Sequence, residues 1–449
     1  MDTLIIILTI LLFMAFLAME IPIGFALLGA GLIGIWGLGF GNSALSFMAA
    51  TPFGTTANYA MLIIPMFLLL GALVSHSGIA SRIFDAANRM LGWLPGGLAV
   101  STIMACTMFG AISGSSAADV ATIGKVSLNE MRRHGYSVRF AAGVIAAGGT
   151  LAILIPPSIP LVMYGILTSE PIGPLLLAGV IPGLLTALAF VAYVVFVCWR
   201  RGIGASDAAL AAASTVSVRR GGFVRRAMTG PYVGMAYAAI LILVIIGGIY
   251  TGVFTSTEAA AVGAFAALAL GIPVTIAEGN DWRSMLGGAL AEAGELTSMV
   301  FVLLIGSAVF SYFLTLSGVA ANLAGWVATL NLSPNQVVAI CLLVLVPLGM
   351  FLDGMSMLLI VVPLVYPLLK QLGVDGIWFG VLTVMLIEIG LLTPPFGINV
   401  FVIAGIADDL PLEQAFAGVM PFIAIQFLMV GLIFFFPELV LFLPSLAAQ

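Results

Sequence analysis

The sequence predicts an all-α polytopic membrane protein built from two inverted-topology repeats. Of its 449 residues, 62% are hydrophobic and only 7% are charged, whereas soluble domains are roughly 45–50% apolar and about 25% charged. The apolar stretches are long and continuous, as expected for helices that satisfy their own backbone hydrogen bonds in lipid. This composition excludes a soluble enzyme, a nucleic-acid-binding protein and a disordered scaffold.

The repeat is visible as similar segments separated by about half of the chain. The Ser-Gly-Ile-Ala segment that begins at Ser77 resembles the Ser-Gly-Val-Ala segment that begins at Ser317, and the double proline at 156–157 corresponds to the one at 394–395. The offsets stay between 238 and 240 residues, which indicates an internal duplication. The other corresponding pairs are Glu20 with Glu258, Ser115 with Asp353, and Pro182 with Pro421.

Each half is predicted to contain apolar helices, a short in-plane helix, a re-entrant helical hairpin, a Pro-broken helix and a final span. The third apolar helices are expected at about 60–76 and 296–316. A central Gly/Ser segment in an apolar run of about thirty residues favours a hairpin over one tilted helix. The predicted segments are the first repeat 1–200 (hairpin about 97–125, broken helix about 136–168), a linker 201–232, and the second repeat 233–449 (hairpin about 335–369, broken helix about 375–407).

The basic residues predict the orientation. Five crossings in each half, an odd number, would invert the two halves relative to each other. In this topology thirteen of the fourteen Lys and Arg residues fall on one side, and only Lys370 falls on the other. Because cytoplasmic loops carry the excess of Lys and Arg, the linker is predicted to be cytoplasmic and both termini to lie outside.

Paired hairpins and broken helices are typical of secondary transporters with a site near the middle of the membrane. At a helix break, free carbonyls can bind a cation and free N–H groups favour an anion. Hydroxyl and carbonyl oxygens suit a hard ion such as sodium better than zinc or iron. The residues expected to bind sodium are Ser113, Gly114, Ser115, Ser116, Gly148, Gly149, Thr150, Pro156, Asp353, Gly354, Thr393 and Pro394. The residues expected to contact substrate are Ser116, Ser158, Ser356 and Asn399.

Several of these residues have two interpretations. Asp353 either serves the ion directly or caps the second helix of its hairpin. Glu388 is either functional, as ionisable groups at membrane depth usually are, or satisfied by a neighbouring helix. The small residues at the tips also allow close helix packing. His76 has no evident acidic partner in the sequence.

Three segments resemble signatures of the large membrane subunit of tripartite ATP-independent periplasmic (TRAP) transporters, namely FGAISGSSAADVATIG, GGTLAILIPPSIPLVMYG and LLTPPFGINVFV. The resemblance covers essentially the whole chain. It implies an elevator-type, sodium-driven uptake of a small carboxylate through the bacterial inner membrane, with periplasmic termini. It also implies two partners, a small four-helix membrane subunit on a separate chain and a soluble periplasmic substrate-binding protein.

Other functions fit the sequence less well. A self-sufficient sodium/dicarboxylate symporter would share the hairpins but need no binding protein. An intramembrane enzyme would need two acids among Asp119, Asp353 and Glu388 in one cavity, yet the repeat places Ser115 opposite Asp353. A passive channel does not require two inverted hairpins. No HExxH, Gly-x-Ser-x-Gly or Walker motif occurs, so no catalytic residue, transition metal or organic cofactor is expected.

Overall fold

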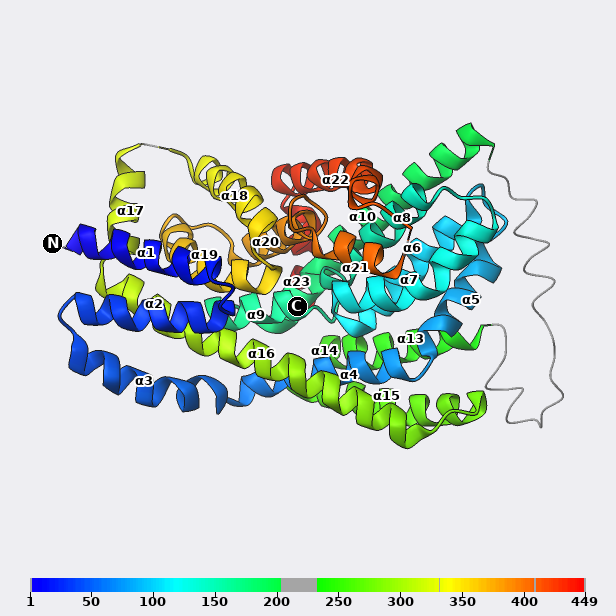
Figure 1. Ribbon diagram of the computed structural model, residues 1–449, viewed down its shortest axis with the longest axis horizontal. Coiled ribbons are helices and arrows are strands. Elements are labelled where there is room, and N and C mark those ends of the chain that lie inside the picture. Colours follow the sequence, from blue (N-terminus) through cyan, green and yellow to red (C-terminus); the bar gives the residue numbers. More distant parts are fainter. Residues whose placement is uncertain (1, 203–231, 331, 408, 448–449) are drawn as a thin grey trace.

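The computed structural model describes residues 2–202, 232–330, 332–407 and 409–447, and every regular element in these ranges is a helix (Figure 1). Seven of the described helices are long and apolar enough to cross a membrane. The prediction of an all-α protein with several membrane-spanning segments is therefore confirmed. Most of the predicted linker 201–232 lies outside the described residues, including the arginines at 219, 220, 225 and 226.

In the first half of the chain, apolar helices lead to a short helix, two paired helices, a broken helix and a long span. These elements are α1 (Asp2–Ala18), α2 (Ile23–Gly37), α3 (Gly41–Thr56), η1 (Tyr59–Leu62), α4 (Ile63–His76), α5 (Ile79–Leu91), α6 (Gly97–Ser113), α7 (Ser116–Arg133), α8 (Val138–Thr150), η2 (Leu151–Ile153), α9 (Ile159–Thr168) and α10 (Ile172–Arg201).

The second half presents its elements in a comparable order. They are α13 (Val233–Ile242), which continues through η3 (Leu243–Gly247) into α14 (Gly248–Tyr250), then α15 (Ser256–Glu278), α16 (Trp282–Leu316), α17 (Val319–Thr329), α18 (Pro334–Phe351), α19 (Gly354–Gln371), α20 (Gly376–Gly390), α21 (Ile398–Ile406), α22 (Leu412–Phe435) and α23 (Glu438–Ala447). The last helix packs against α10 and α20.

Two pairs of helices form hairpins. Helices α6 and α7 pack against each other and against α8, and α18 and α19 pack against each other and against α20. Helix α7 continues to Arg133, beyond the end expected near residue 125. The apolar pattern does not reach this end, because the last turns of α7 carry charged residues.

The long helix α16 packs along α2, and glycines bring the two backbones together. A Cβ atom at Gly306 would lie 2.1 Å from the Gly24 carbonyl oxygen, so only glycine fits there. Small residues of this kind let membrane helices approach closely. The sequence predicted this helix from residue 296, but α16 begins at Trp282. Its first turns carry charged residues, which interrupt the apolar pattern. Helix α3 was not predicted because its sequence, GNSALSFMAATPFGTT, is rich in small and polar residues.

The buried apolar side chains form two separate clusters. The larger cluster includes residues of both hairpins, both broken helices and α10, α13, α15 and α22. The smaller cluster joins α1 and α2 to the second half of α16 and includes Leu27, Phe310 and Phe313. The last turns of α16 therefore share a small core with α1 and α2, whereas its earlier part, with Met285 and Leu303, belongs to the larger core that contains the hairpins.

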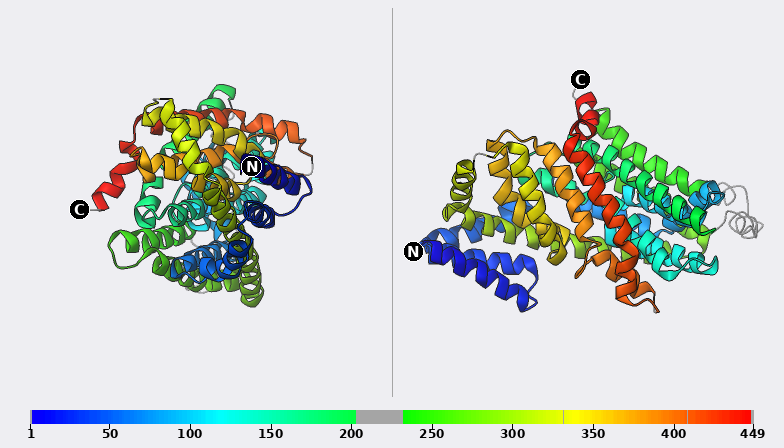
Figure 2. Two further views of the ribbon diagram at one scale, coloured as in Figure 1. Left: turned by 90° about the vertical axis from the view of Figure 1, so that its left-hand side faces the viewer. Right: turned by 90° about the horizontal axis from the view of Figure 1, so that it is seen from above.

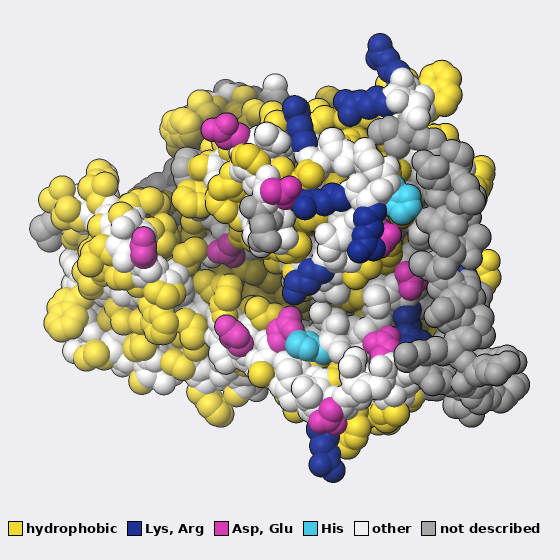
Figure 3. Space-filling model, turned by 45° about the vertical axis from the view of Figure 1, so that its right-hand side comes forward, with side chains coloured by type: hydrophobic (Ala, Val, Ile, Leu, Met, Phe, Trp, Pro, Cys, Tyr) yellow, Lys and Arg dark blue, Asp and Glu magenta, His cyan; other side chains and the backbone are white. Residues whose placement is uncertain are grey.

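The basic side chains gather over one part of the surface. In Figure 3 the Lys and Arg side chains lie over the right-hand half of the visible face, and the left-hand half is largely hydrophobic. In the described residues several arginines mark helix ends, among them Arg132 and Arg133 at the end of α7 and Arg200 and Arg201 at the end of α10. The N-terminus lies at one end of the long axis and the C-terminus at the edge of the molecule (Figure 2).

Candidate functional site

The tip of the first hairpin is a tight turn between α6 and α7. Gly114 follows the last residue of α6 with φ +61°, a conformation that favours glycine. A Cβ atom there would lie 2.8 Å from the Pro157 carbonyl oxygen. Ser115 caps α7, because its Oγ accepts a hydrogen bond from Ala118 N at 3.5 Å, and Ser113 Oγ accepts one from Ser115 N at 3.4 Å. The first tip therefore lies directly on the proline break of the same half.

The tip of the second hairpin is organised by Asp353. Its Oδ2 accepts hydrogen bonds from Met355 N and Ser356 N, both at 3.1 Å, and its Oδ1 accepts one from Ser356 Oγ. Of the two interpretations of Asp353, the structure shows the helix cap. Gly354 packs on α20, since a Cβ atom there would lie 2.3 Å from Ile387 Cγ2. The carboxylate is stabilised by the positive end of α19.

The two broken helices are interrupted at equivalent places. In the first half, the break follows Thr150, and Ser158 caps α9 by accepting from Leu161 N at 3.3 Å while its hydroxyl donates to Ile153 O. In the second half, α20 ends at Gly390 and α21 begins at Ile398. Thr393 Oγ1 donates to Ile389 O at 2.6 Å. The peptide bonds Pro156–Pro157 and Pro394–Pro395 are both cis.

The two tips meet at a cavity of about 210 Å³. Ser115 and Ser116 line it from the first tip, and Asp353 and Gly354 line it from the second. Four helices begin at this cavity. Their N-terminal residues on its wall are Ser116 and Ala117 of α7, Ile159 and Pro160 of α9, Gly354 and Met355 of α19, and Ile398 of α21.

Helix N-termini and one carboxylate set the electrostatics of this cavity. The N-terminus of a helix carries roughly half a positive charge and unpaired N–H groups. No Lys, Arg or His is among the described residues that line the cavity. The helix ends are therefore the source of positive potential at the cavity. The Asp353 carboxylate on the same wall opposes it and already accepts hydrogen bonds from two N–H groups of α19.

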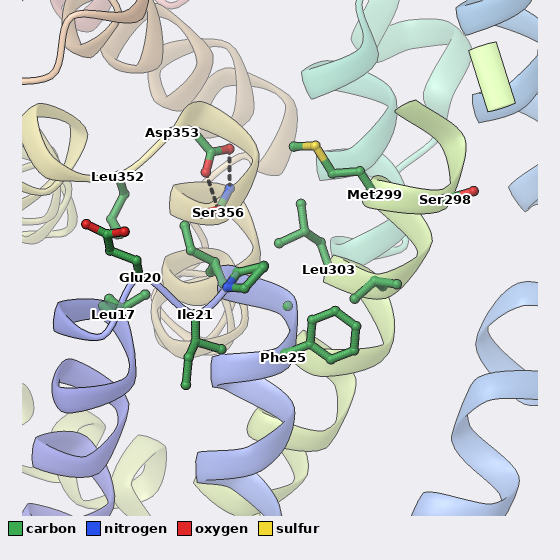
Figure 4. A pocket seen from close by; sticks show the side chains of 14 residues that line it. Leu17, Glu20, Ile21, Phe25, Ser298, Met299, Leu303, Leu352, Asp353 and Ser356 are labelled. Carbon is green, nitrogen blue, oxygen red and sulfur yellow. Dashed lines mark hydrogen bonds between the residues drawn. The ribbon is translucent and has the colours of Figure 1, made fainter. Parts of the chain in front are cut away.

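A second cavity of about 610 Å³ lies beside the first and shares Asp353 and Met299 with it. Figure 4 shows Asp353 and Ser356 on one wall, Met299 and Leu303 of α16 on another, and the α1–α2 corner with Glu20 below them. Its volume is in the range of roughly 300–1,000 Å³ that is typical of small-molecule sites. The cavity therefore lies between the tip of the second hairpin and the α1–α2 corner, whereas elsewhere α16 contacts α19 directly, since Ser307 Oγ donates to Leu359 O at 2.6 Å.

Gly114 also lines the smaller cavity. Most of the remaining residues predicted to bind sodium or substrate are not among the residues that line these two cavities. Gly148 and Gly149 are buried and let α8 approach α6 and α7, since Cβ atoms there would lie 3.0 Å from Cys106 Sγ and 2.3 Å from Val120 Cγ2. Pro156 is buried and Pro394 is half-buried. Ser356, by contrast, lines the larger cavity.

Two buried amides connect these elements. Asn399, predicted to contact substrate, is fully buried, and its Nδ2 donates to Ser116 Oγ at 2.6 Å and to Ala146 O at 3.1 Å. Gln426 of α22 donates to Thr150 Oγ1 at 2.8 Å and to Glu388 Oε2 at 3.3 Å. Glu388 thus has a partner on a neighbouring helix.

Sequence reasoning missed Gln426, although a polar amide in the middle of an apolar span is a usable signal. It also missed the acidic partner of His76, whose Nε2 lies 2.7 Å from Glu292 Oε2. Within the described ranges, no group of three or more His, Cys, Asp or Glu side chains is placed to hold a metal ion.

Comparison with known proteins identifies relatives along almost the whole chain. Residues 10–439 match the family described as "Tripartite ATP-independent periplasmic transporter, DctM component". The C4-dicarboxylate TRAP transporter large permease protein of Pseudomonas aeruginosa is 36% identical over 408 residues, which cover 90% of this chain and 91% of that protein. The sialic acid TRAP transporter large permease protein of Vibrio cholerae is 32% identical, with 95% of each chain covered.

A solved structure supports the fold. The YdaH transporter of Alcanivorax borkumensis matches with a TM-score of 0.60 over 87% of this chain and 88% of that chain, at 15% sequence identity. The relatives are permeases by name. Together with the seven helices of membrane-spanning length, they make this chain a multi-pass protein of the inner membrane. The chain belongs to the tripartite ATP-independent periplasmic transporter family, as a large permease (DctM) component.

Proposed function

We propose that the chain carries a small organic acid into the cell together with sodium ions. The observation that carries this proposal is the convergence of four helix N-termini and both hairpin tips on one cavity of about 210 Å³. Such a cavity attracts a carboxylate. C4-dicarboxylates and sialic acid, named for two relatives, give the substrate class.

Sodium is the proposed coupling ion because the residues of both tips and both breaks carry hydroxyl, carboxylate and carbonyl oxygens. In the first half the proposed ligands come from the segments 113–116 and 148–150 and from Pro156. In the second half they come from Asp353, Gly354, Thr393 and Pro394. Carbonyls released at the ends of α6, α8 and α20 can complete each site, and such neutral oxygens suit a hard monovalent ion.

The proposed movement is of elevator type. The two halves are proposed to be inverted repeats, whose hairpins and broken helices move together against helices that include α1, α2 and α16. The cavity of about 610 Å³ between the second tip and the α1–α2 corner supports this division. Gly78 and Gly318, at φ +78° and +67°, lie between α4 and α5 and between α16 and α17. These equivalent glycines are suitable hinges.

The proposed assembly includes two partners. A small four-helix membrane subunit would sit beside this chain, and a soluble periplasmic protein would deliver the substrate. The isethionate TRAP transporter permease protein DctMQ of Oleidesulfovibrio alaskensis supports a second membrane component, since this chain covers only 65% of it. The basic side chains over one part of the surface support a cytoplasmic linker and periplasmic termini.

Uptake into proteoliposomes tests the proposal. The chain would be reconstituted with its small subunit and offered labelled C4-dicarboxylates and sugar acids, with and without an inward sodium gradient and the binding protein. We expect uptake only when both are present. Uptake with sodium alone would instead indicate a self-sufficient symporter, and uptake without sodium would refute the coupling.

A further inference from the structure

Gln426 joins the two broken helices through a single amide group. Its side chain is 1% exposed, and its Nε2 donates to Thr150 Oγ1 at 2.8 Å and to Glu388 Oε2 at 3.3 Å. Thr150 ends α8, and Glu388 lies in the last turn of α20. Both hydrogens of one NH₂ group therefore hold helices that belong to different halves of the chain.

The two partners of Gln426 occupy equivalent positions in the repeat. Glu388 and Thr150 are separated by 388 − 150 = 238 residues, the offset of the double prolines. Each lies six residues before the first proline of its break, since 156 − 150 and 394 − 388 are both 6. Gln426 thus contacts the same point of both broken helices.

Direct contacts continue from these points to both hairpin tips. On the first side, Asn399 Nδ2 links Ser116 Oγ to the Ala146 carbonyl of α8. On the second side, Ile387, the neighbour of Glu388, packs on Gly354. A continuous path therefore runs from the first tip through α8, Gln426 and α20 to the second tip.

Packing alone does not explain an amide at this position. Thr383 of α20 and Thr186 of α10 are also buried polar residues, but each hydroxyl is satisfied by a carbonyl one turn earlier in its own helix. Gln426 instead donates to two other helices. A polar side chain in a membrane span is expected to have a functional partner.

We propose that Gln426 is a positioning residue that couples the two tips, so that sodium bound at one tip changes the affinity of the other. This inference rests on the proposed sodium coupling. A shift of α8 on ion binding moves the Thr150 hydroxyl, and Gln426 transmits the shift to Glu388 and α20. Coupling of this kind requires a structural element whose position depends on both sites. The shared NH₂ group of Gln426 is such an element.

The test is the sodium dependence of uptake in Gln426→Met, which keeps the volume of the side chain but removes both donors. Wild-type uptake should be cooperative in sodium, with a Hill coefficient above 1. Couplings between sites usually change affinity by about 5- to 150-fold, so we expect Gln426→Met to raise the half-saturating sodium concentration by about tenfold. We also expect the Hill coefficient to fall to about 1, with a smaller change in the maximal rate.

Matched variants separate coupling from a general loss of structure. Thr383→Val removes a buried hydroxyl from α20 without joining two helices, and Glu388→Gln keeps an acceptor for Gln426. Both should keep the wild-type sodium dependence. Gln426→Asn replaces the methionine variant in the test if that variant does not fold, because its shorter side chain cannot reach both partners. It should show the same rise in half-saturating sodium concentration and the same fall in the Hill coefficient.

The outcomes distinguish this inference from the proposed function. Wild-type uptake that does not depend on sodium refutes the proposed function itself. Sodium-dependent wild-type uptake with an unchanged Hill coefficient and half-saturation in the Gln426 variants overturns the coupling. An equal effect of Thr383→Val also overturns it, because any loss of a buried hydrogen bond would then act alike.

Discussion

Replacing Gly114 by alanine is predicted to destabilise the first hairpin tip through two separable effects. A left-handed conformation costs an L-residue roughly 1–2 kcal/mol, and Gly114 has φ +61°. The added Cβ would also lie 2.8 Å from the Pro157 carbonyl oxygen and 3.3 Å from Ile159 Cγ1, and such overpacking costs about 1–3 kcal/mol. Gly114→Ala should therefore lower the free energy of unfolding by about 2–5 kcal/mol.

Gly135 provides the control for the backbone effect. It lies between α7 and α8 with φ +77°, and no atom lies within 4 Å of the position that its Cβ would take. Gly135→Ala should therefore cost only the roughly 1–2 kcal/mol of the left-handed conformation. The difference between the two variants, about 1–3 kcal/mol, measures the contact between the tip and the proline break.

The two variants would be compared by equilibrium unfolding in mixed detergent micelles and by uptake in proteoliposomes. We expect Gly114→Ala to lose more stability and more uptake than Gly135→Ala, because only the first displaces the break from the cavity wall. Equal losses in both assays would refute the close approach of the tip to Pro157.

Asp353→Asn should unfold like the wild type, because Asn caps helices about as well as Asp, but should lose sodium-driven uptake. Wild-type uptake in that variant would remove the Asp353 charge from the proposed second sodium site. Gly306→Ala should cost about 1–3 kcal/mol of unfolding free energy by pushing α16 from α2. Gly287→Ala in the same helix, where a Cβ meets no atom within 4 Å, should not, and matching losses would contradict the close packing. His76→Gln should change the unfolding free energy by less than about 1 kcal/mol, because the His76–Glu292 pair is more than a third exposed. A larger change in a thermal-melt comparison with Glu292→Gln would show that the pair is not an ordinary surface contact.

The tips and breaks could be predicted from the sequence because local covalent constraints determine them. A double proline cannot continue a helix, and a Gly-Ser segment in an apolar run permits a reversal at Gly114. Each tip and each break also has a counterpart at the corresponding position of the other half, and this repetition supported the prediction. The capping role of Asp353 was also one of two stated interpretations, and the local hydrogen bonds show this cap, while the role of Asp353 at the ion stays a prediction.

The contacts between distant segments could not be predicted in the same way. Gln426 is 276 residues from Thr150, and Asn399 is 283 residues from Ser116. No periodicity in one sequence specifies which buried amide meets which hydroxyl across such separations. Helix α3 was not predicted for a different reason, because its small and polar side chains form no continuous apolar segment.

The charge balance of the cavity explains why substrate and ion should depend on each other. Four helix N-termini contribute at most about two positive charges, and part of this potential is already used by the Asp353 carboxylate at the start of α19. Under the proposed function, a dicarboxylate would bring two negative charges to a wall without Lys or Arg among its described residues. Cotransported cations would supply the difference, because an uncompensated charge in a low-dielectric interior is costly. A moving block that held only the anion or only the ions would carry a net charge into the membrane, whereas the filled block would be close to neutral, and this difference would favour movement of both together.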